Sequence, residues 1–182
     1  MGLMSGSVRS DPRRVRAARR ARFPAVRARR PAPGRHHPAS AADVRAALSA
    51  FGAEAYYGVR LVELVPAMHG NEGLALGRLA GPGHVVLYDQ PPPPWRLGAY
   101  LLEAERAWLA SAGADVAAAG VVGWSGDSLR RFMLGHVLAH EIGHHVVQHE
   151  RRLRGERAAR TRDHEARAEA IAARLRERLA WP

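Results

Sequence analysis

The sequence predicts an α+β domain in which about three strands precede two long helices. Three observations lead to this prediction. The chain has 182 residues, which is enough for one ordinary domain. Short β-branched runs occur between residues 58 and 88, and helical periodicity fills most of residues 128–179. Because the strands come first and the long helices follow, the pattern favours an α+β arrangement over alternating strands and helices.

The first 39 residues differ in composition from the rest. Residues 1–40 contain 11 Arg and one acidic residue, whereas residues 41–182 contain 17 Arg and 16 acidic residues. Large apolar side chains are scarce in this segment, so it cannot bury enough surface to offset the entropy lost on ordering. We therefore expect residues 1–39 to form a disordered Arg/Pro-rich tail and residues 40–182 to form the folded domain. Three interpretations of the tail stay open: it binds nucleic acid or another anionic surface through its charge, it results from a misassigned translation start, or it is solvated and has no specific partner.

The elements of the domain are expected in the following order. Ser40 and Asp43 indicate the start of a short helix, and Gly52 indicates its end. Three strands follow, at residues 58–65, 74–79 and 84–88, of which the last, HVVLY, has the strongest pattern.

The second half of the domain is expected to be mostly helical. A helix covers residues 99–110, and the glycine-rich residues 120–126 form a loop. Asp127 is a candidate N-cap for a long helix from about residue 128 to about residue 149. The last helix covers residues 161–179, with Thr161 as its candidate cap.

The composition excludes several classes of protein. The chain has no Cys, which excludes a disulfide scaffold, a thiolate metal site and cysteine catalysis. It has no apolar run of about 18 residues, so we expect no transmembrane helix and no membrane partner. The N-terminus lacks the apolar segment of a secretory signal, so we expect a cytoplasmic protein.

The long helix carries the pattern H-E-x-x-H at residues 140–144. On a helix, His140 and His144 lie one turn apart on the same face, where two imidazoles can converge on one ion. Neutral imidazole is a preferred zinc ligand. Glu141 lies beside this pair, where a carboxylate can take a proton from water that the metal activates. Polar residues at these positions of a very apolar helix need partners, and a metal ion provides one.

A zinc site of this type needs a third protein ligand and leaves the fourth position to water. Glu165 continues the apolar stripe of the last helix by one turn, so it is the leading candidate, and the neighbouring His164 is its main rival. Glu169 lies one turn further along and is suited to accept a hydrogen bond from a ligand imidazole.

Two further histidines lie near the motif. His136 lies one turn before His140, and we expect it to line the site. It cannot act as a third ligand, because three imidazoles stacked along one helix do not close a tetrahedron. His145 is off the ligand face and is expected at the surface.

The stretch HVLAHEIGHHVVQH, followed about 20 residues later by DHEARAEAIAARL, resembles the gluzincin branch of the zincin metallopeptidases. The resemblance implies a zincin-like fold, with a small mixed sheet of about three strands packed on an active-site helix and a C-terminal Glu-bearing helix. It implies that His140, His144 and Glu165 bind zinc, that Glu141 is the general base, and that Glu169 supports the site. It also implies that HVVLY is the edge strand that binds extended substrate.

The resemblance has limits. The metzincin pattern does not fit, because Val147 and Glu150 stand where that branch has Gly and His. The chain has Glu169 where the gluzincin pattern more often has Asp. No Tyr or His follows Glu165 to stabilise an oxyanion, and Trp181 is the only aromatic residue there.

Taken together, these features predict a zinc metallopeptidase that cleaves a peptide or protein substrate with metal-activated water. The main alternative is a non-catalytic or regulatory zinc-binding domain that recognises a protein partner. A third possibility is a nucleic-acid-associated protein that acts through its Arg-rich tail.

Overall fold

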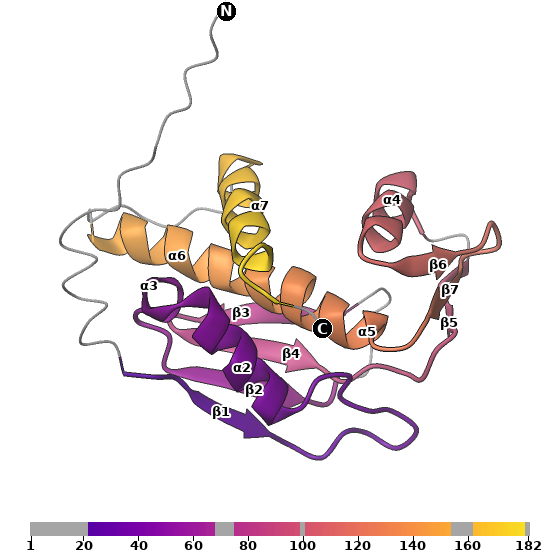
Figure 1. The fold of residues 1–182 in the computed structure, drawn as a ribbon, viewed down its shortest axis with the longest axis horizontal. Coiled ribbons are helices and arrows are strands. Elements are labelled where there is room, and N and C mark those ends of the chain that lie inside the picture. Colours follow the sequence, from indigo (N-terminus) through magenta and orange to yellow (C-terminus); the bar gives the residue numbers. More distant parts are fainter. Residues whose placement is uncertain (1–21, 68–74, 99–100, 154–161, 181–182) are drawn as a thin grey trace, which may run out of the picture.

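The structure, a computed structural model, describes residues 22–67, 75–98, 101–153 and 162–180. It has a mixed α+β fold with two small sheets, which confirms the predicted fold class (Figure 1). The larger sheet has the strand order β1-β2-β4-β3, formed by Ala25–Ala28, Leu61–Val65, His84–Tyr88 and Gly77–Gly81. The first three of these strands in the sheet run parallel, and β3 is antiparallel to β4.

One face of the larger sheet packs against the helices and forms the hydrophobic core with them. Alternate residues of β2 and β4 point to this face and are buried: Val62, Leu64, Val85 and Leu87. The helix α2 (Ala41–Phe51) packs against β1 and against residues 133–138 of the long helix described below, so helices cover this face. Its start is the expected one, because Ser40 and Asp43 form a capping box before Ala41. Gly52 follows its last residue, also as expected, and a short helix α3 (Ala53–Tyr56) comes next.

The expected long helix is present, but it is not α-helical throughout. It consists of α5 (Ser128–Phe132), a π-helical turn η2 (Met133–Leu138) and α6 (Ala139–Leu153). Asp127 precedes it, although its carboxylate binds Arg130 at 2.5 Å and makes no capping hydrogen bond. The H-E-x-x-H pattern therefore lies in the first turns of α6, directly after the π turn.

The last helix, α7 (Arg162–Arg176), crosses α6 at very short range. Gly143 lies at the crossing, where a β-carbon would come within 2.3 Å of the carbonyl oxygen of Ala168. Ala168 and Ala172 are fully buried there. Small residues on both helices thus let the two backbones approach closely, which brings the first turn of α7 next to α6. The predicted cap Thr161 lies outside the described residues.

The expectation that residues 1–39 are disordered is wrong for residues 22–39. Within this range β1 extends the larger sheet beside β2, with Val26 buried. The following loop is held by the fully buried Asp89, which binds Arg35 Nε and the backbone N–H of Ala32, both at 2.7 Å. A backbone edge and one buried carboxylate therefore order a segment that lacks large apolar side chains. Residues 1–21 lie outside the described part.

The second sheet was missed by the sequence prediction. It has the order β5-β7-β6, formed by Trp95–Arg96, Val121–Trp124 and Ala114–Val116, and α4 (Glu103–Ser111) packs against β6. Residues 121–124 were expected in a loop because of the surrounding glycines, but tertiary pairing makes them the central strand. In Figure 1 this unit lies beside α5, at one end of the long helix.

A further correction concerns the edge of the larger sheet. HVVLY is β4, which lies between β2 and β3, so it is not the edge strand. The edges of the sheet are β1 and β3, and β3 lies at one of them because the chain returns antiparallel beside β4 through a tight turn. Among the described residues, no helix is long and apolar enough to cross a membrane.

Candidate metal centre

The central helix supplies two imidazoles to one site. His140 and His144 are separated by one turn of α6, and their ring centroids are 4.5 Å apart. His144 is almost fully buried, whereas the His140 side chain is 30% exposed. Packing therefore fixes His144, whereas His140 partly faces solvent.

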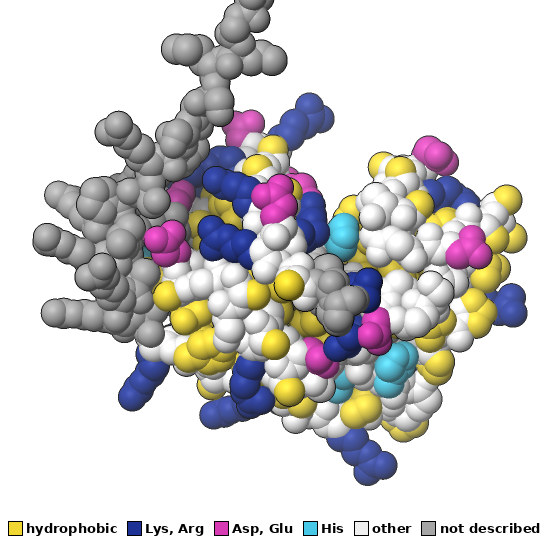
Figure 2. Space-filling model, viewed as in Figure 1, with side chains coloured by type: hydrophobic (Ala, Val, Ile, Leu, Met, Phe, Trp, Pro, Cys, Tyr) yellow, Lys and Arg dark blue, Asp and Glu magenta, His cyan; other side chains and the backbone are white. Residues whose placement is uncertain are grey.

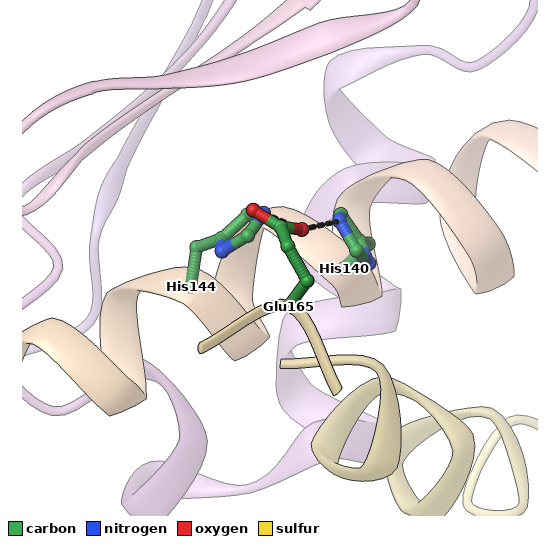
Figure 3. A group of neighbouring side chains, drawn as sticks. All are labelled: His140, His144 and Glu165. Atoms are coloured by element: carbon green, nitrogen blue, oxygen red, sulfur yellow. Dashed lines mark ion pairs between the residues drawn. The ribbon is translucent and has the colours of Figure 1, made fainter. Parts of the chain in front are cut away.

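The third group comes from the first turn of α7. Glu165 Oε2 lies 3.4 Å from His144 Nε2 and 3.7 Å from His140 Nε2, as Figure 3 shows. One ligand atom from each of the three residues lies within 4.8 Å of the others, so the group could hold a metal ion. The sequence-predicted ligand set is thus brought together by the close crossing at Gly143.

The separations fit one small ion. Zinc binds imidazole nitrogen and carboxylate oxygen at about 2.0–2.2 Å, so two of its ligands in a tetrahedron lie about 3.3–3.6 Å apart. The two distances from the Glu165 oxygen to the imidazole nitrogens are close to this spacing.

Glu169 orients His140 from the side opposite Glu165. Its Oε2 lies 3.1 Å from His140 Nδ1, and its Oε1 accepts a hydrogen bond from Arg176 at 2.7 Å. Burial alone would raise the pKa of Glu169, but the hydrogen bonds from Arg176 and His140 outweigh it, and the pKa lies below its ordinary value. Glu169 is therefore ionised at neutral pH and acts as an acceptor.

This contact fixes where the proton of His140 lies. Because an ionised carboxylate can only accept, Nδ1 carries the proton in the bond to Glu169. In the neutral imidazole, which is the form that binds a metal, Nε2 then presents its lone pair to Glu165. A cation held between Nε2 and the Glu165 oxygen, which lie 3.7 Å apart, attracts both atoms.

His164 does not compete with Glu165 for the metal position. It is fully buried, and its Nε2 contacts His144 Nδ1 at 2.9 Å, on the far side of the ring from Glu165. The rival interpretation of His164 as third ligand is therefore wrong. A residue one position before Glu165 on α7 points into the helix interface, where it fixes the orientation of His144.

Three further candidate residues lie on the same long helix: Glu141, His145 and His136. Glu141 is buried on α6 between the two ligand histidines in sequence. His145 was expected at the surface, but it is buried, and its Nε2 donates to the carbonyl oxygen of Tyr57 at 2.9 Å. Its packing against α3 and the following turn explains the difference. His136 lies in η2 among aromatic rings, and its surroundings are described below.

Comparisons with known proteins do not assign the chain to a family: no family model, no curated protein and no solved structure matches it.

Proposed function

We propose that this chain is a zinc-dependent peptidase that uses His140, His144 and Glu165 to hold the metal and Glu141 as the general base. The observation that carries the proposal is the convergence of His140, His144 and Glu165, one ligand atom of each lying within 4.8 Å of the others, while Glu169 contacts Nδ1 of His140. Such an arrangement suits a site built around a cation. The His/His/Glu donor set and its spacing favour zinc among the common metals.

Each residue then has a defined task. When bound, zinc polarises a carbonyl group and lowers the pKa of water, which supplies a nucleophile at neutral pH. Glu141 accepts the proton of the attacking water and passes it to the amine that leaves. Glu169 holds His140 in the tautomer that binds metal through Nε2, and the contact from His164 holds the ring of His144 in place. Glu165 is 49% exposed, so the centre is open to a substrate.

The larger sheet offers a place for an extended substrate. Among the described strands, β3 pairs only with β4, so its outer edge has backbone groups available for another strand. This edge lies next to α6, which carries the metal ligands. A peptide added along β3 would gain main-chain hydrogen bonds and pass close to the site.

The experiment compares zinc content and peptide hydrolysis in wild type and four variants. We expect one zinc per wild-type chain, and loss of that zinc in His140→Ala and Glu165→Ala. Glu141→Gln is expected to keep zinc and lose hydrolysis. Glu177→Gln, an exposed residue at the end of α7, is the matched control and is expected to keep both.

Two results would contradict the proposal. Zinc that persists in Glu165→Ala would show that α7 supplies no ligand. Stoichiometric zinc in the wild type without hydrolysis of any peptide in a diverse library would instead indicate the alternative, a non-catalytic zinc-binding domain.

A further inference from the structure

His136 lies on the long helix between α4 and α7. It lies in η2, and its ring centroid is 5.8 Å from that of Phe132 and 6.2 Å from that of Trp108 on α4. Glu169 and Arg176 of α7 are close enough to act on its charge. Figure 2 shows a hollow between α4 and α7, with a histidine side chain visible in it. His136 is thus contacted from α4 on one side and influenced from α7 on the other.

The side chain of His136 makes no hydrogen bond with any residue that the structure describes. Its Nδ1 is buried, and its contacts are with aromatic rings. A buried N–H without an acceptor costs more than a buried lone pair without a donor, so the proton belongs on Nε2. The ring therefore offers one donor, Nε2–H, which is not enclosed by protein.

This donor is uncharged at neutral pH. Burial and, to a lesser extent, the positive charge of Arg176 lower the pKa of His136 to about 4, against a smaller opposite effect of Glu169. His136 lies four residues before the ligand His140, and a neutral N–H there would not repel a bound cation as an imidazolium would, yet it still stabilises negative charge on a nearby oxygen.

The backbone around His136 also differs from an ordinary helix. Residues 133–138 form a π-helical turn, and α-helix resumes at Ala139, directly before His140. π turns are rare and are found frequently at functional sites. Here the wider turn changes the direction in which His136 leaves the helix, relative to the ligand histidines one turn later.

We propose that His136 is a catalytic residue that donates its Nε2–H to the carbonyl oxygen of the scissile peptide and stabilises the negative charge that develops there. No bond is made or broken at His136, and its proton stays on Nε2 throughout. This role rests on the proposed peptidase function.

The test uses two substitutions with opposite chemistry. His136→Phe keeps an aromatic ring for the contacts with Phe132 and Trp108 but removes the donor. His136→Gln loses the ring but keeps an N–H donor of similar reach. His36→Phe, a histidine in the loop that follows β1 and whose side chain makes no described hydrogen bond, is the matched control. Zinc content, kcat, KM and the inhibition constant of a phosphinic peptide, whose tetrahedral phosphorus mimics the attacked carbon, are measured for each zinc-loaded protein.

We expect all four proteins to bind one zinc. His136→Phe is expected to lower kcat about 10²–10³-fold, which is the effect of removing one oxyanion donor, with little change in KM. The inhibition constant of the phosphinic peptide should rise in parallel. His136→Gln should recover most of both losses, and His36→Phe should match wild type.

The outcomes separate this role from the peptidase function itself. Wild-type kcat in zinc-loaded His136→Phe would overturn the role of His136 and leave the peptidase function intact. Equal loss in the Phe and Gln variants would also overturn it, because it would show that packing matters and the donor does not. A zinc-loaded wild type that neither cleaves peptides nor binds the phosphinic peptide would refute both.

Discussion

Replacing Gly143 by Ala tests whether the crossing of α6 and α7 builds the metal centre. The added β-carbon would lie 2.3 Å from the carbonyl oxygen of Ala168 and about 3 Å from two further backbone atoms of that residue. Ordinary contact begins at 3.4 Å, and the obstacle is backbone, which cannot rotate away as a side chain would. The two helices must therefore separate locally by about 1 Å.

The displacement acts on the site through Glu165. This residue lies three positions before Ala168, one turn along α7, so it moves with the displaced helix. Metal–ligand distances tolerate deviations of only about 0.2 Å, so a shift of about 1 Å removes Glu165 from the coordination sphere. We expect zinc affinity to fall at least about 10²-fold, which is about 2.7 kcal/mol.

Stability of the metal-free protein should change less than zinc affinity. Overpacking costs about 1–3 kcal/mol, but Ala is about 1 kcal/mol more favourable than Gly inside a helix, and the two effects partly cancel. Zinc affinity is measured by competition with a chromogenic chelator, and stability by denaturant unfolding in excess chelator. Gly81→Ala on β3, where a β-carbon meets nothing within 4 Å, is the matched control and should leave affinity unchanged. Wild-type zinc affinity in Gly143→Ala would refute the reasoning.

Three further predictions follow from the groups around the ligands. His136 is neutral in the folded chain down to a pKa of about 4, whereas the unfolded chain takes up its proton near 6.5; stability should therefore be lost as pH falls from about 6.5 to 4. Partial exposure of the ring limits this loss to about 1–2 kcal/mol, and denaturant unfolding in chelator should show a flatter profile for His136→Phe. Glu169→Gln should weaken zinc binding about 10–100-fold, because it replaces the ionised partner of His140; chelator competition that gives an unchanged affinity would contradict this. His164→Leu, which removes the nitrogen that contacts His144, should weaken zinc binding about tenfold, and His164→Gln should recover part of the loss; equal affinity in the two variants would count against the hydrogen bond.

Much of the candidate site could be predicted from local pattern. The i, i+4 spacing of His140 and His144 needs only a helix to place both rings on one face, and the surrounding apolar residues make that helix certain to be buried. The apolar stripe of α7 likewise placed Glu165 on the side that faces α6. These inferences succeed because helical periodicity is a property of the chain itself and survives tertiary packing.

His164 and His145 show where such inference fails. The exposure of each depends on what lies against its helix, and the chain segment responsible is distant in sequence, as with Tyr57 against His145. The π turn at residues 133–138 also has no local signal, because its residues have ordinary helical character.

The sequence by itself determined the helices, the capping box at Ser40, the strand HVVLY and the residues able to bind a metal. Each of these follows from side-chain chemistry within a few residues. Tertiary structure alone decided that residues 25–28 complete the larger sheet, that β3 lies at its edge, and that residues 121–124 join a second sheet. Strand pairing is made by backbone groups that every residue carries, so its partners are chosen by the whole fold and leave little trace in any one segment.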